Sequence, residues 1–133
     1  MNEFSAVSLD RLKTADHELQ ELFHHVLRVH DCSILEGFRD EATQNEYFAE
    51  GKSKVEYPGS KHNRYPSRAV DVAPYPIDWA DTKRFYYFAG IVKGVAAGLD
   101  MDIRFGGDWD SDNDLNDQTF NDLVHFEDRK SVV

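Results

Sequence analysis

Hydrophobic residues near the start of the chain recur at intervals of three and four positions. They are Leu9, Leu12, Leu19, Leu22, Phe23, Val26 and Leu27. This spacing places apolar side chains on one side of a helix, and Ser8 is a residue type that can cap its first turn. The pattern predicts one amphipathic helix over residues 9–30.

Two later segments also have helical signatures. Residues 41–50 follow Asp40, a residue type that caps helices, and end before Gly51, a residue type that often terminates them. From residue 81 to residue 99 the apolar positions again follow helical spacing. We therefore expect a short helix after Asp40 and a second long helix over 81–99.

Short apolar runs between these segments indicate strands. The runs cover residues 33–38, 69–73, 103–105 and 124–127. Glycines and prolines interrupt residues 51–67, which predicts an ordered but irregular loop. The order of elements predicts an α+β fold, with helices packed on a small, mainly antiparallel sheet. At 133 residues, the chain suits one domain over residues 1–133.

The charge of the chain is strongly acidic and uneven. A net charge of -10 argues against nucleic acid as a partner, because binding a phosphate backbone needs clustered basic residues. Asp110, Asp112 and Asp114 place carboxylates at alternate positions, as a calcium loop does, but the Gly and Glu of an EF-hand are missing. A calcium site at these three residues and a solvated acidic loop are both open.

Several classes of site and segment are disfavoured. The single cysteine, Cys32, excludes an internal disulfide and a cysteine-rich metal site. No run of about 18 apolar residues is present, so we expect no membrane insertion. His24 and His25 are adjacent on the first predicted helix and point in different directions, unlike a helical pair that binds one metal.

Two histidines and one aspartate lie in short segments far apart along the chain. They are His62, in the irregular loop, and Asp71 and His125, in predicted strands. Two imidazoles and one carboxylate match the ligand count of a catalytic zinc site, in which zinc keeps one position for water and lowers the pKa of that water to about 7. A structural role for each histidine is the alternative, and convergence of the three side chains decides between the two.

Peptide hydrolysis at such a site also needs a base and a group that stabilises the oxyanion. Asp122 is the first choice for the base, and Glu127 is the second. Arg39, at a predicted junction between strand and helix, could hold the oxyanion or a substrate carboxylate. Ser60 and Arg68 are weaker candidates for substrate contacts or for hydrogen bonds to the metal ligands.

Five short segments stand out along the chain: LEGFR at 35–39, SKH at 60–62, AVD at 69–71, IRFGGDW at 103–109 and DLVHFE at 122–127. Together they resemble a family of zinc peptidases that includes D-alanyl-D-alanine carboxypeptidases and phage L-alanyl-D-glutamate endopeptidases. The resemblance covers residues 33–127 and implies a hedgehog/DD-peptidase-like fold. It also implies that the zinc ligands are His62, Asp71 and His125.

By the same resemblance, Asp122 corresponds to the catalytic acid/base and Arg39 to the arginine that stabilises substrate or transition state. An Asp, rather than a Glu, three residues before the last ligand is more similar to the phage endopeptidase branch. Eight residues separate His62 from Asp71, a longer spacing than the common pattern of the family. The extra residues can bulge outward at little cost.

The implied function is zinc-dependent hydrolysis of peptidoglycan stem peptides by a phage endolysin that cuts between L-alanine and D-glutamate. The alternatives are a D-alanyl-D-alanine carboxypeptidase and a non-catalytic peptidoglycan-binding virion module. We expect a monomer without a signal peptide, made in the host cytoplasm and acting in the periplasm or cell wall.

Overall fold

The computed structural model describes residues 1–116 and 122–129, which form an α+β fold as the sequence predicts. Its helices are α1 (Ala6–Leu12), α2 (His17–Val29), α3 (Glu41–Ala49) and α4 (Thr82–Gly98), with a 3-10 turn η1 (Lys61–Asn63). Its strands are β1 (Cys32–Glu36), β2 (Ala69–Pro74), β3 (Ile103–Phe105) and β4 (His125–Asp128). The strands form one sheet in the order β1-β2-β4-β3, and every neighbouring pair is antiparallel.

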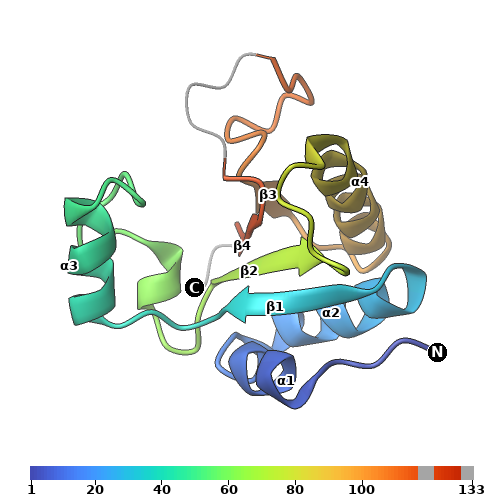
Figure 1. Ribbon diagram of the computed structural model, residues 1–133, viewed down its shortest axis with the longest axis horizontal. Coiled ribbons are helices and arrows are strands. Elements are labelled where there is room, and N and C mark those ends of the chain that lie inside the picture. Colours follow the sequence, from blue (N-terminus) through green and yellow to red (C-terminus); the bar gives the residue numbers. More distant parts are fainter. Residues whose placement is uncertain (117–121, 130–133) are drawn as a thin grey trace.

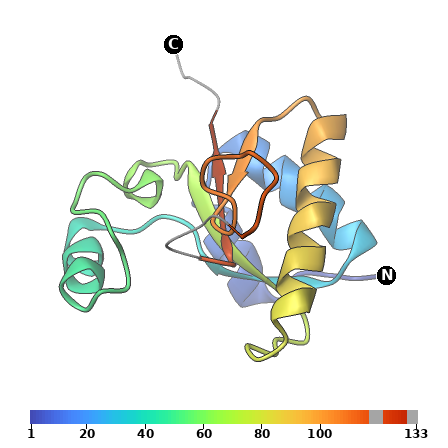
Figure 2. The ribbon, with the colours of Figure 1, turned by 90° about the horizontal axis from the view of Figure 1, so that it is seen from above.

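The sheet separates the helices into two groups (Figure 1). Helices α2 and α4 lie side by side and cover one face, whereas α3 and the loop that follows it lie on the other side of β2 and β4 (Figure 2). Within the described residues, no helix combines the length and the apolar character that crossing a membrane requires. The arrangement leaves the ends of β2 and β4 facing α3 and its loop.

Phe126 of β4 is the centre of the hydrophobic core. Its fully buried ring contacts Phe23 of α2 at a centroid distance of 5.7 Å, Phe88 of α4 at 6.1 Å and Phe105 of β3 at 5.4 Å. Aromatic contacts of this kind stabilise a fold beyond the area that they bury. Because side chains alternate along a strand, the neighbours of Phe126 in β4 point to the opposite face.

The predicted helix over 9–30 is wrong as a single element, because the chain forms α1 and α2 instead. Between them, backbone groups bond to a distant segment: Asp16 N donates to Ser67 O, and Ser67 N donates to Thr14 O. Asp16 then caps α2 by accepting a hydrogen bond from Leu19 N at 2.8 Å. The apolar periodicity continues through this break, so it gives no sign of the interruption.

Ser8 does not cap α1 as expected. Ser5 is the cap, and the buried hydroxyl of Ser8 accepts a hydrogen bond from Ile34 N of β1. Strand β1 also ends earlier than the predicted run 33–38, at a tight contact around Gly37. A Cβ atom on Gly37 would lie 2.5 Å from the carbonyl oxygen of Arg11, so only glycine fits against α1 here.

The other elements follow the sequence closely. Helix α3 begins after its cap Asp40, which accepts a hydrogen bond from Thr43 N, and the chain turns at Gly51 with a φ of 77°. Helix α4, β2 and β4 differ from the predicted ranges at their ends only, and β3 matches its range. The predicted irregular loop 51–67 contains the short turn η1.

Candidate active site

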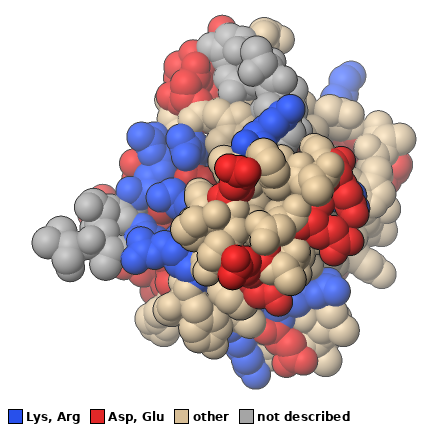
Figure 3. All heavy atoms as spheres, turned by 90° about the vertical axis from the view of Figure 1, so that its left-hand side faces the viewer, with Lys and Arg blue, Asp and Glu red and all other residues tan. Residues whose placement is uncertain are grey.

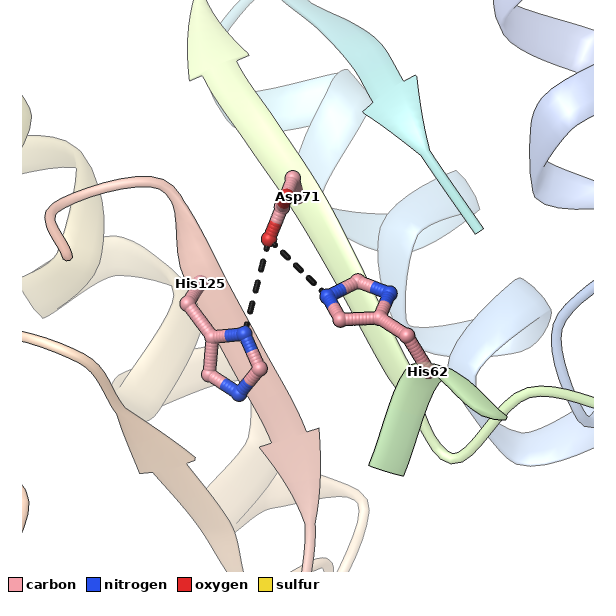
Figure 4. A group of neighbouring side chains, drawn as sticks. All are labelled: His62, Asp71 and His125. Carbon is pink, nitrogen blue, oxygen red and sulfur yellow. Dashed lines mark hydrogen bonds and ion pairs between the residues drawn. The ribbon is translucent and has the colours of Figure 1, made fainter. Parts of the chain in front are cut away.

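The side chains of His62, Asp71 and His125 point toward one another beside β2 and β4 (Figure 4). Asp71 of β2 and His125 of β4 are directly opposite each other in the antiparallel register, and His62 reaches them from η1. Asp71 Oδ1 lies 3.2 Å from His62 Nε2 and 3.5 Å from His125 Nδ1. One potential ligand atom from each residue lies within 4.8 Å of the others, which is close enough to hold one metal ion.

The ring of His62 is fixed by the backbone around it. Its Nδ1 lies 2.7 Å from the carbonyl oxygen of Gly37, which can only accept, so Nδ1 carries the proton and Nε2 is left to bind a metal. The Ser60 hydroxyl caps η1 by accepting from His62 N, and Asn63 bonds back to Ser60 N. Ser60 therefore supports the turn that presents His62.

His125 is oriented in the same way by a carboxylate. Its Nε2 donates to Glu127 Oε1 at 2.7 Å, which leaves Nδ1 facing Asp71. Glu127 Oε2 in turn accepts two hydrogen bonds from Arg104, at 2.8 and 3.2 Å. Both oxygens of Glu127 are thus engaged, so the geometry makes Glu127 a residue that orients His125 and disfavours the second-choice assignment as base.

The charged groups of the site shift one another's pKa values. Burial alone would raise the pKa of Asp71, but the charge of His62 and the hydrogen bonds from both histidines lower it below its usual value. Burial would lower the pKa of His125, but the hydrogen bonds to Asp71 and Glu127 raise it to about 9. The site therefore favours positive charge, and a bound metal cation would compete with protons for it.

Asp122 lies beside this group and lines a pocket together with His62 and His125. Its backbone is held by two hydrogen bonds: Asp122 N donates to Gly106 O, and His125 N donates to Asp122 O. A Cβ on Gly106 would lie 2.1 Å from the Asp122 carbonyl oxygen, so the glycine is needed for this close approach. Burial, followed by repulsion from Asp71, raises the pKa of Asp122.

Arg39 lies directly before the cap of α3 and lines the same pocket. Its guanidinium donates to Glu36 Oε1 and to Gln44 Oε1, and it lies 3.6 Å from Asp71 Oδ2. The ring of Tyr47 stacks against it, with the centroid 4.6 Å from Cζ. With only 7% of its surface exposed, Arg39 is held rigidly at the edge of the candidate metal site.

A pocket of about 530 Å³ joins these groups. The residues of the site that line it are Arg39, Ser60, His62, Asp122, His125 and Glu127. Arg68 does not line it: the buried Arg68 side chain donates to the carbonyl oxygen of Asp128 and faces Asp16. The geometry therefore places Arg68 away from the position where a substrate would bind.

Sequence reasoning missed two parts of the site. Gln44 is fully buried and contacts Arg39, yet an uncharged residue inside a predicted helix gives no sign of this role. Trp109 lies in the segment that carried the family resemblance, and its ring lies 5.1 Å from that of His125. Trp109 thus forms part of the wall next to the candidate metal site.

A second group of carboxylates forms in the acidic loop, with a composition that differs from the expected one. Asp108, Asp110 and Asp112 come together, whereas Asp114 instead accepts a hydrogen bond from Asn116 N. Asp108 is only 5% exposed, and within the described residues its Oδ1 has no hydrogen-bond partner. A buried oxygen of this kind is costly unless a cation or water satisfies it.

Comparisons with known proteins agree over almost the whole chain. Residues 1–128 match the model of a family described as phage L-alanyl-D-glutamate peptidase. The L-alanyl-D-glutamate peptidase of Escherichia phage T5 is 31% identical over 121 residues, which cover 87% of this chain and 88% of that protein. The crystal structure of the L-Ala D-Glu endopeptidase ChiX of Serratia marcescens matches with a TM-score of 0.77 and 25% identity, over 96% of this chain and 89% of that one.

Proposed function

This chain belongs to the phage L-alanyl-D-glutamate peptidase family, and we propose that it is a zinc-dependent endopeptidase that cuts the L-alanyl-D-glutamate bond in peptidoglycan stem peptides. The observation that carries the proposal is the convergence of ligand atoms from His62, Asp71 and His125 within 4.8 Å of one another, each histidine with its other ring nitrogen already bonded. The family and the pocket geometry support the same chemistry.

The donor set suits zinc. Two imidazole nitrogens and one carboxylate oxygen are typical zinc ligands, and three protein ligands leave a position for water. When bound, zinc would polarise the substrate carbonyl and lower the pKa of its water to about 7. His62, Asp71 and His125 would hold the ion, and the Gly37 carbonyl and Glu127 would keep the two rings in place.

Asp122 and Arg39 carry out the proton transfer and the stabilisation of the oxyanion. The Asp122 carboxylate takes a proton from the attacking water and returns it to the leaving amide nitrogen, a role suited to a half-buried group that lines the pocket. Arg39 lines the same pocket and donates hydrogen bonds to the negative charge that develops on the substrate carbonyl oxygen. Glu36 and Gln44 hold its guanidinium in place for this interaction.

Digestion of purified muropeptides by the zinc-loaded protein, read by mass spectrometry, tests the function. Release of L-alanine-terminated and D-glutamate-initiated fragments is expected. Loss of a terminal D-alanine instead would indicate a carboxypeptidase, and binding without any cleavage would indicate a non-catalytic module.

A substitution tests the role of Asp122. Asp122→Asn should lower kcat about 100- to 10,000-fold while zinc content is retained. Unchanged activity in this variant would show that Asp122 is not the catalytic base.

We also propose that Asp108, Asp110 and Asp112 bind calcium. Three carboxylates of one loop, one of them with a buried oxygen that lacks a partner in the described part of the chain, support a site for a hard cation. Millimolar calcium should raise the melting temperature of the wild type and of Asp114→Asn, but not of Asp108→Asn. A wild type that does not respond to calcium would refute the site, and a response lost in Asp114→Asn would show that the ligand set is wrong.

We propose, finally, that the protein acts on the wall as a monomer after its synthesis in the host cytoplasm. The pocket and the candidate ligands are complete within one chain, which supports a monomeric enzyme. Sedimentation of the active protein at working concentration would reveal a larger species if this is wrong.

A further inference from the structure

The two walls of the pocket have opposite charge patterns. One wall comes from η1 and the loop before it, and it presents Lys52, Lys54 and Lys61. The other wall presents Asp110, Asp122 and Glu127, of which Glu127 is paired with Arg104. The basic wall is local: residues 51–68 contain five Lys or Arg and one Glu in a chain with a net charge of -10. On the face seen in Figure 3, the largest group of Lys and Arg side chains lies apart from the acidic group at the top.

Lys61 is the basic residue of this wall that is linked most directly to the candidate metal site. It is the first residue of η1, directly before His62, and its side chain is half-buried. Within the described residues Lys61 has no ion-pair partner, whereas the charge of Arg39 is balanced by Glu36 and Asp71. Lys52 pairs with Glu50 at 3.0 Å at the edge of the wall. Lys61 therefore brings an uncompensated positive charge to the pocket.

The basic wall is fixed relative to the rest of the site. Gln44 Nε2 donates to Ser53 Oγ and to the carbonyl oxygen of Val55, at 3.0 and 2.8 Å. Its Oε1 accepts from Arg39 and from Asn63 of η1. One buried side chain thus ties the wall, the arginine and the turn that carries Lys61 into a single unit.

Given the proposed function, we propose that Lys61, together with Lys52 and Lys54, binds the carboxylate that the D-glutamyl residue retains on the leaving side of the scissile bond. A glutamyl residue has two carboxyl groups, its amino group forms the bond that is cut, and the stem continues through one carboxyl only. The other stays negatively charged at neutral pH. The acidic wall would repel it, so the lysine wall sets both the orientation of the substrate and the preference for an acidic residue after the cut.

Two synthetic stem peptides, identical except that this carboxylate is replaced by a carboxamide, test the proposal. The wild type should cleave the carboxylate peptide with a kcat/KM about fivefold to tenfold higher, mainly through a lower KM. Lys61→Gln should lose most of this preference, and Lys61→Arg should retain it. Lys83→Gln, an exposed lysine of α4 outside the pocket, is the matched control and should behave as the wild type.

The outcomes separate this proposal from the assignment of function. A wild type that cleaves neither peptide would overturn the proposed function itself. Equal cleavage of both peptides by the wild type, or an undiminished preference in folded Lys61→Gln, would overturn the lysine wall and leave the endopeptidase intact. Circular dichroism of each variant checks that the fold is retained.

Discussion

Asp16 and Asp40 each cap the first turn of a helix, yet their surroundings move their carboxyl pKa values in opposite directions. Burial raises the pKa of Asp16, despite the hydrogen bond that it accepts from Leu19 N. Asp40 is exposed, and its hydrogen bond from Thr43 N lowers its pKa. The same local motif therefore carries opposite pH dependences.

The pair predicts opposite slopes of stability against pH. The folded state binds a proton on Asp16 more readily than the unfolded state, so the contribution of Asp16 falls as pH rises from its ordinary pKa through the raised one. The contribution of Asp40 is present above its ordinary pKa and is lost as pH falls through the lowered one. Asn can still cap a helix but does not titrate.

Urea unfolding of wild type, Asp16→Asn and Asp40→Asn between pH 3 and pH 7 would measure both slopes. Relative to Asp16→Asn, the wild type should lose stability as pH rises; relative to Asp40→Asn, it should gain. Two differences with the same sign would contradict the roles that burial and capping play here.

The charge of Glu127 leads to a second prediction about a single residue. Its pKa is lowered, because the hydrogen bond and charge of His125 outweigh the effect of burial, so it faces His125 as a carboxylate. Glu127→Gln keeps an acceptor for Nε2 but removes the charge, and zinc affinity should fall about 10- to 100-fold. Competition with a chromogenic chelator measures the zinc affinity, and Glu56→Gln, at an exposed position, is the control. Equal zinc affinities of the wild type and Glu127→Gln would show that the charge of Glu127 does not support metal binding.

At the scale of elements, α3 holds the site together through Gln44. Gln44→Leu would remove the buried acceptor of Arg39 Nη1 and the donor to Ser53 Oγ and the Val55 carbonyl. We expect a loss of about 1–3 kcal/mol in the free energy of unfolding and a lower kcat. Gln44→Glu keeps the acceptor for Arg39 but loses the donor to the wall, so KM should rise more than kcat falls.

Chemical unfolding and steady-state kinetics of both variants would check this, with exposed Asn45→Ala on the same helix as control. If the two Gln44 variants changed kcat and KM in the same proportions, the separate roles assigned to Oε1, which accepts from Arg39, and to Nε2, which donates to the wall, would be wrong.

Some elements of the fold could be predicted from the sequence, and others could not. Helices α3 and α4 and strand β3 were predictable, because caps, periodicity and apolar runs are local signals. The break between α1 and α2 was not, because it depends on hydrogen bonds to Ser67, far along the chain. The convergence of Asp71 with His125 depends likewise on the β2–β4 register, which local spacing does not contain.

At the scale of the whole molecule, the metal site joins segments that are otherwise distant. His62 follows α3, Asp71 lies on a central strand, and His125 belongs to the last strand, so a bound ion would connect both sides of the fold. An unfolded chain cannot present these three groups together. Zinc should therefore stabilise the folded state strongly.

Removal of the metal tests this coupling. A ligand that binds only the folded state at 1,000 times its Kd stabilises it by about 4 kcal/mol, which for a domain of this size shifts Tm by on the order of 10 °C. Calorimetry of the zinc-loaded protein, before and after dialysis against a chelator, should show this drop and its reversal when zinc is restored. His62→Ala should start at a low Tm and respond little to either treatment. A chelator effect of equal size in His62→Ala would place the stabilising ion elsewhere, and the acidic loop around Asp108 would be the next position to test.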